Sequence, residues 1–155
     1  MPRTVKKPDE RRDDILQAAR ALFLTKEYGK TTMQDIMRKL NIAKGTIYHY
    51  FTSKEAILEA VVEMLVNEEL RRKKKLLEKA RCRELDAIEK LRLLTKTDHL
   101  SEENEKILEH LHRPGNAVMH ARQLGRYLDL LAPIYAGVFE EGCRQGIFRT
   151  EHPLE

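Results

Sequence analysis

One short segment carries side chains that suit contact with the bases and phosphates of DNA. Its polar members are Lys44, Thr46, Tyr48 and His49. Lys44 can reach a guanine edge or a phosphate, and Thr46 can offer a hydroxyl to a phosphate or a methyl group to thymine. His49 can donate to a base edge or a phosphate. Gly45 has no side chain, so the backbone there can approach DNA closely.

Two short helices separated by a tight turn would present this segment outward. The first has apolar residues at the spacing of one helical face: Met33, Ile36, Met37 and Leu40. Thr32 and Asp35 are spaced as a near capping box, and Asn41 tolerates the left-handed backbone of a sharp turn. The second helix is expected over residues 43–49, with Ile47 facing inward. This arrangement is a helix-turn-helix, the motif that places its second helix in the major groove.

Phosphate contacts are expected at both edges of the motif. Thr32 and Gln34 lie at the start of its first helix. Lys54 lies in the first turn of the helix that follows, where free backbone N–H groups also favour a phosphate. We therefore interpret these three residues as a phosphate clamp. Tyr50 and Phe51 are expected to pack in the core of the motif.

The rest of the chain has an all-helical pattern. We expect a flexible arm over residues 1–8, a helix-turn-helix domain over residues 9–52 and a helical regulatory domain over residues 53–155. The first helix should span residues 9–26 and could continue beyond, because Glu27 is not a glycine. Ser53 should cap a long helix reaching about residue 81. Pro133 falls inside the last long helical pattern and should kink it.

Charge is concentrated in the first third of the chain. Residues 1–54 carry 12 Lys and Arg against 6 Asp and Glu, whereas residues 55–155 carry 17 against 19. An excess of positive charge around a helix-turn-helix is typical of a surface that binds nucleic acid. The alternative is that these charges are scattered at random over the protein surface and have no function.

Other chemistry finds no support in the sequence. No apolar run is long enough to span a membrane, and no signal peptide opens the chain, so we expect a cytoplasmic protein. The sequence contains no phosphate-binding glycine loop and no catalytic motif, and we expect neither an enzyme nor a cofactor. His110 and His112 would point to different faces of a helix, which argues against a metal site. Cys82 and Cys143 are read as reduced thiols.

The run KGTIYHYFTSKEAIL at residues 44–58 resembles the signature of the TetR (tetracycline-repressor) family of transcription regulators. The matching positions are Gly45, Thr46, Tyr48, Tyr50, Phe51, Lys54, Glu55 and Leu58. The similarity covers roughly residues 9–65 and resumes weakly at EEGCRQGIF near the C-terminus. It implies a double-stranded DNA operator read by a homodimer, with half-sites about 34 to 36 Å apart. It also implies that Tyr48 contacts a phosphate.

The resemblance further implies a repressor released by a small-molecule effector bound in the C-terminal helices. The residues that could line such a pocket are Met119, His120, Tyr127, Tyr135 and Phe139; plain helix packing is their alternative role. The chain stops near Pro153, where the family's two dimerisation helices would begin. Two other functions stay open: a constitutive DNA-binding dimer without an effector, and a helical protein-interaction module.

Overall fold

The computed structural model describes residues 7–96, 102–110, 112 and 114–149, and these residues form helices and turns without a strand. The helices are α1 (Pro8–Lys26), α2 (Met33–Leu40), α3 (Lys44–Tyr50), α4 (Lys54–Cys82), α5 (Ala87–Thr95), α6 (Glu102–Glu109) and α7 (Ala117–Arg144), with a 3-10 turn at Pro114–Asn116. The predicted all-α class is therefore confirmed. Most of the predicted arm, at residues 1–6, and the last six residues lie outside the described part.

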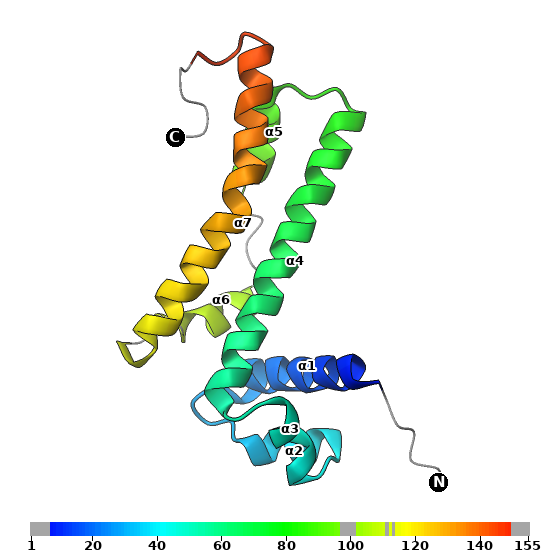
Figure 1. The fold of residues 1–155 in the computed structure, drawn as a ribbon, viewed down its shortest axis with the longest axis vertical. Coiled ribbons are helices and arrows are strands. Elements are labelled where there is room, and N and C mark those ends of the chain that lie inside the picture. Colours follow the sequence, from blue (N-terminus) through cyan, green and yellow to red (C-terminus); the bar gives the residue numbers. More distant parts are fainter. Residues whose placement is uncertain (1–6, 97–101, 111, 113, 150–155) are drawn as a thin grey trace.

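The helices form a small head and a longer body (Figure 1). The head consists of α1, α2, α3 and the first turns of α4. α4 then leaves the head and runs alongside α7, with α5 packed at the far end. α6 lies between the head and the near end of α7. One continuous helix thus joins the predicted reading unit to the body.

Local signals set the ends of α2 as the sequence predicts. The Thr32 hydroxyl accepts from the Asp35 N–H, and the Asp35 carboxylate accepts from the Thr32 N–H, which completes a capping box. Asn41 ends the helix in a left-handed conformation with φ 51°. α3 begins one residue later than expected, because Ala43 is its N-cap. The Ser53 side chain caps α4 by accepting from the N–H of Ala56.

Each of the four helices of the head contributes at least one apolar side chain to its core. Fully or almost fully buried members include Ile15, Ala19, Phe23, Ile36, Ile47, Phe51, Ile57 and Leu58. Burying a side chain of this size stabilises the fold by about 1.5 to 3 kcal/mol. Phe51 is buried and Tyr50 packs against the same cluster, as predicted. Ile47 joins α3 to this shared core, and α3 packs mainly against α2.

The connection from α1 to α2 begins after Lys26, the predicted end of the first helix. α1 ends at Lys26 and does not continue, because Glu27 takes φ 65° and ψ 148°. This backbone region favours glycine and costs a residue with a side chain on the order of 1 to 3 kcal/mol. The Glu27 carbonyl accepts from both the N–H and the hydroxyl of buried Thr31, at 3.1 and 2.8 Å. These bonds hold the turn that sets α2 in place.

The far end of the body has a second, smaller core between α5 and α7. Ala87, Leu94 and Val138 are its buried members. A side chain at Gly142 would meet the Phe148 ring at 2.2 Å, so only glycine allows this close packing. α7 continues through Pro133, and Figure 1 shows the helix bending partway along its length.

Candidate nucleic-acid interface

α3 presents its polar residues on the outer surface of the head. Ile47 is fully buried beneath it, whereas Lys44, Gly45, Tyr48 and His49 are exposed. A helix repeats every 3.6 residues, so anchoring Ile47 inward turns the residues on either side toward solvent. Thr46 is half-buried at the edge of this surface. The predicted reading residues therefore share one outward-facing helix.

Two ring contacts order the exposed side chains of α3. The Lys44 Nζ lies 5.7 Å from the centroid of the Tyr48 ring, within the range of a cation–π contact. The His49 ring meets the Tyr50 ring edge-on, with centroids 5.0 Å apart. These contacts limit the conformations that Lys44 and His49 explore, so less side-chain entropy would be lost on binding.

Gly45 has no structural reason to be a glycine. A Cβ built at this position would meet nothing within 4 Å, and its φ is not positive. Glycine costs a helix about 0.5 to 1 kcal/mol relative to alanine. Gly45 therefore lowers the stability of α3 slightly, at the position where the predicted interface needs a backbone without a side chain.

The three predicted phosphate contacts differ in how free their side chains are. Gln34 is exposed. The Thr32 hydroxyl is engaged in the capping box and also donates to the Asp35 carboxylate at 2.8 Å. The Lys54 ammonium donates to the carbonyl of Tyr28 at 3.0 Å and lies 4.3 Å from the centroid of its ring. Lys54 therefore ties the start of α4 to the α1–α2 turn, a structural role that sequence reasoning missed.

Tyr28 is the centre of this junction. Its ring packs against those of Phe23 and His110, with centroids 5.0 and 5.3 Å away. Its hydroxyl lies 3.4 Å from the Glu55 carboxylate. Burial, followed by the negative charge of Glu55, raises the pKa of Tyr28 to about 12. The residue thus connects α1, α4 and the end of α6 as a neutral phenol.

Asp35 brings a negative charge close to the expected phosphates. Its carboxylate pairs with the Lys26 ammonium at 2.7 Å. The hydrogen bond from Lys26, followed by those from Thr32, lowers the pKa of Asp35 well below its usual value. The carboxylate is therefore ionised at neutral pH, and Lys26 offsets its charge next to the surface.

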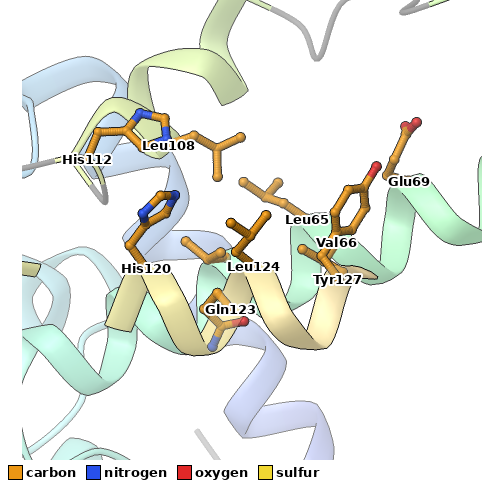
Figure 2. A pocket seen from close by; sticks show the side chains of 10 residues that line it. Leu65, Val66, Glu69, Leu108, His112, His120, Gln123, Leu124 and Tyr127 are labelled. Carbon is orange, nitrogen blue, oxygen red and sulfur yellow. The ribbon is translucent and has the colours of Figure 1, made fainter. Parts of the chain in front are cut away.

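A cavity of about 210 Å³ lies in the body between α4, α6 and α7. Its lining residues are Val62, Leu65, Val66, Glu69, Leu108, His112, His120, Gln123, Leu124 and Tyr127. Figure 2 shows His120, Leu124 and Tyr127 along one helix, facing Leu65 and Val66 across the gap.

The structure does not bring the five predicted pocket residues together. His120 and Tyr127 line the cavity. Met119 packs against the core of the head, and Tyr135 belongs to the second core, where its hydroxyl donates to the Leu94 carbonyl at 3.0 Å. Phe139 is 38% exposed and contacts Phe148. The wall contributed by α4 was missed, because its apolar stripe reads as ordinary core.

Two further observations concern other kinds of site. Within the described ranges, no group of three or more His, Cys, Asp or Glu residues could hold a metal ion. None of the helices there is long and apolar enough to cross a membrane.

Comparison with protein families finds two matches along the chain. Residues 15–61 match the family described as bacterial regulatory proteins, tetR family. Residues 99–155 match a domain described as tetracyclin repressor-like, C-terminal. The first match contains the helix-turn-helix and the second contains α6 and α7.

Curated relatives match about two fifths of this chain. The HTH-type transcriptional repressor KstR2 of Mycolicibacterium smegmatis is 39% identical over 61 residues, which are 39% of this chain and 30% of that protein. The HTH-type transcriptional regulator YfiR of Bacillus subtilis is 34% identical over 64 residues, 41% of this chain and 31% of that protein. The matched segment thus spans about a third of these relatives. Both are named as transcription regulators, the class of protein that the sequence predicts.

Solved structures resemble most of the chain. A TetR-family regulator from Syntrophomonas wolfei is 26% identical with a TM-score of 0.62, and the match covers 93% of this chain and 74% of that one. The fatty acid degradation regulator FadR of Bacillus halodurans has a TM-score of 0.69 at 21% identity, covering 94% and 74%. The arrangement of head and body is therefore a known one.

Proposed function

Because this chain belongs to the TetR family of bacterial transcription regulators, we propose that it represses transcription by binding a double-stranded operator through α3. The outward face of α3 carries this proposal. Lys44, Tyr48 and His49 are exposed over a buried Ile47, and Gly45 leaves the backbone bare between them. Such a helix fits the major groove, where Lys44 and His49 would contact base edges and Tyr48 a phosphate.

Phosphate contacts would come from the edges of the motif. Gln34 is free to reach the backbone of the duplex. The Lys54 ammonium has three N–H donors, of which one is used on the Tyr28 carbonyl, so it can still attract a phosphate. The Thr32 hydroxyl would contribute from the start of α2. These contacts position the head and carry no sequence information themselves.

We propose that the regulator acts as a homodimer. One head makes few base contacts, and two heads can read two half-sites about one DNA turn apart. α7 also exposes apolar side chains that a monomer would leave in water. Val118 and Leu128 are 82 and 52% exposed. An exposed apolar face of this kind supports assembly with another helical surface.

We further propose that a small-molecule effector binds in the cavity of the body and lowers operator affinity. α4 forms one wall of the cavity and its first turns belong to the head. Ion pairs join α4 to α7: Glu59 pairs with Arg122, and Glu63 with Arg126 at 2.7 Å. An occupant that shifts α7 against α4 would therefore also change the position of α3. A coupling of about 1 to 3 kcal/mol is typical of such linkage.

The DNA-binding role can be tested by comparing two lysines. A duplex would be selected from a random pool, and its affinity measured by fluorescence anisotropy at several salt concentrations. Lys44→Ala should weaken binding about tenfold or more, or about 1.4 kcal/mol. Lys79→Ala removes the same charge from the exposed far part of α4 and should have no effect. Equal affinities of both variants and the unmodified chain would refute the assignment of α3.

Measuring operator affinity with and without a molecule bound in the cavity distinguishes an effector-controlled regulator from a constitutive one. If no occupant of the cavity changes operator affinity, the body serves assembly alone. The alternative of a protein-interaction module predicts no duplex binding, or binding without the salt slope of about −0.9 for each phosphate neutralised.

A further inference from the structure

The cavity between α4, α6 and α7 has two polar ends separated by apolar walls. Figure 2 shows His112 and His120 at one end, and Tyr127 with Glu69 at the other. His120 and Tyr127 are seven residues apart on α7, which corresponds to about 10 Å along the helix. The walls between them are formed by Val62, Leu65, Val66, Leu108 and Leu124, together with Gln123, whose amide N–H donates to Glu59. An occupant must therefore be mostly apolar, with a polar group that matches one end or both.

The Glu69 end offers nothing to a cation. The Glu69 carboxylate accepts two hydrogen bonds from Arg72, both at 2.8 Å, and pairs with the Lys73 ammonium at 3.3 Å. The hydrogen bond from Arg72 dominates and lowers the pKa of Glu69, so the group is ionised and its charge is already matched. Burial raises the pKa of Tyr127, which keeps its hydroxyl neutral. This end can therefore accommodate a neutral terminus or a methyl group.

The histidine end has donors to spare. The rings of His112 and His120 meet edge-on with centroids 4.7 Å apart. Among the described residues, neither imidazole makes a hydrogen bond or an ion pair, and Glu69 is the only carboxylate that lines the cavity. An imidazole N–H hydrogen-bonds well to an anionic oxygen, and two imidazoles can serve the two oxygens of one carboxylate. A cationic group placed here would meet no acceptor of opposite charge.

We propose that the cavity binds a small monocarboxylic acid with an apolar chain. Its carboxylate lies beside the paired rings of His112 and His120, within reach of both, and its chain runs along Leu65 and Leu124 toward Tyr127. The cavity volume of about 210 Å³ suits a short chain. Only the role of this acid as the effector rests on the proposed function. Its binding in the cavity does not depend on that function.

Three eight-carbon probes that differ only in the head group test the proposal: octanoate, 1-octanol and octylamine. Titration calorimetry on the full chain should give the tightest binding for octanoate, at least tenfold weaker binding for 1-octanol, and none for octylamine. His120→Leu and His112→Leu keep an apolar bulk but remove a donor. Each should lower octanoate affinity about tenfold and leave 1-octanol unchanged. His112 is exposed, so its variant decides the matter if the His120 variant does not fold.

Several results would overturn the proposal. These are octylamine binding as tightly as octanoate, equal affinities for all three probes, or octanoate binding that neither histidine variant changes. Operator binding is measured on the same preparations. Octanoate that binds without altering operator affinity would refute the effector role and leave the ligand class standing. Absence of octanoate binding in a chain that still binds its operator would refute the ligand class alone.

Discussion

Replacing Gly45 with alanine should separate stability from DNA binding. A methyl group at this position would meet no atom within 4 Å in the free protein. The backbone is helical and its φ is not positive, so alanine fits without strain. Its higher helix propensity should stabilise the fold by about 0.5 to 1 kcal/mol. For a chain of this size that gain raises the melting temperature by about 1 to 4 °C.

The same methyl group would stand between α3 and the duplex. We expect operator affinity to fall about tenfold, which is about 1.4 kcal/mol. Gly137→Ala is the matched control, because Gly137 is also helical and exposed with nothing within 4 Å, but lies on α7. It should raise stability by a similar amount and leave operator affinity unchanged. Thermal unfolding and fluorescence anisotropy on both variants supply the two readouts.

Two outcomes would refute this reasoning. If Gly45→Ala binds the operator as tightly as the unmodified chain, the backbone of α3 does not approach DNA closely. If Gly45→Ala is less stable than the unmodified chain, while Gly137→Ala is more stable, the surroundings of Gly45 are not open. A loss of binding in both variants would point to the body and not to α3.

Three further variants test the head. Glu27→Gly relieves a backbone at φ 65° and should stabilise the fold by about 1 kcal/mol in urea denaturation, and a loss would show that the side chain matters more than the strain. Thr32→Ala removes the N-cap of α2 and should cost about 1 kcal/mol, whereas an unchanged midpoint would rule out a role for the capping box. The folded pKa of Tyr28, about 12, lies above its unfolded value, so its contribution is complete below pH 10 and lost as pH rises toward 12. Tyr28→Phe should therefore lose less stability than the unmodified chain between pH 9 and 11.5; equal losses would contradict the raised pKa.

The helix-turn-helix could be predicted because its signals are local. The capping pair Thr32 and Asp35 and the turn residue Asn41 lie within ten residues of one another. Each acts on the backbone next to it, so its effect does not depend on distant parts of the chain. The buried position of Ile47 followed from the same local periodicity. The outward face of α3 could therefore be predicted from the sequence.

The contacts of Lys54 could not be predicted in the same way. Its partner Tyr28 is 26 residues away, and the two meet only because α4 packs against the end of α1. From the sequence, Lys54 was predicted to contact a DNA phosphate, and no contact within the protein was predicted for it. The left-handed backbone at Glu27 was missed for a related reason, since the bonds to Thr31 that hold it depend on how the turn is packed.

The cavity shows the limit of periodicity as a guide. Aromatic and sulfur-containing side chains of the last helix were expected to line it, yet Met119 and Tyr135 pack in the two cores. Leu65 on α4 and His112 after α6 line the cavity instead. An apolar stripe has the same spacing whether it faces another helix or an open space. Only the relative placement of α4, α6 and α7 distinguishes the two.

The central claim is that α3 enters the major groove. Dimethyl sulfate methylates guanine at N7, an atom that lies on the major-groove edge of the base. A duplex selected by the full chain would be treated with this reagent in the presence and absence of protein. We predict that guanines in two half-sites about one DNA turn apart become protected, and that Lys44→Ala weakens this protection. Guanines that stay fully reactive in a saturated complex would contradict the account.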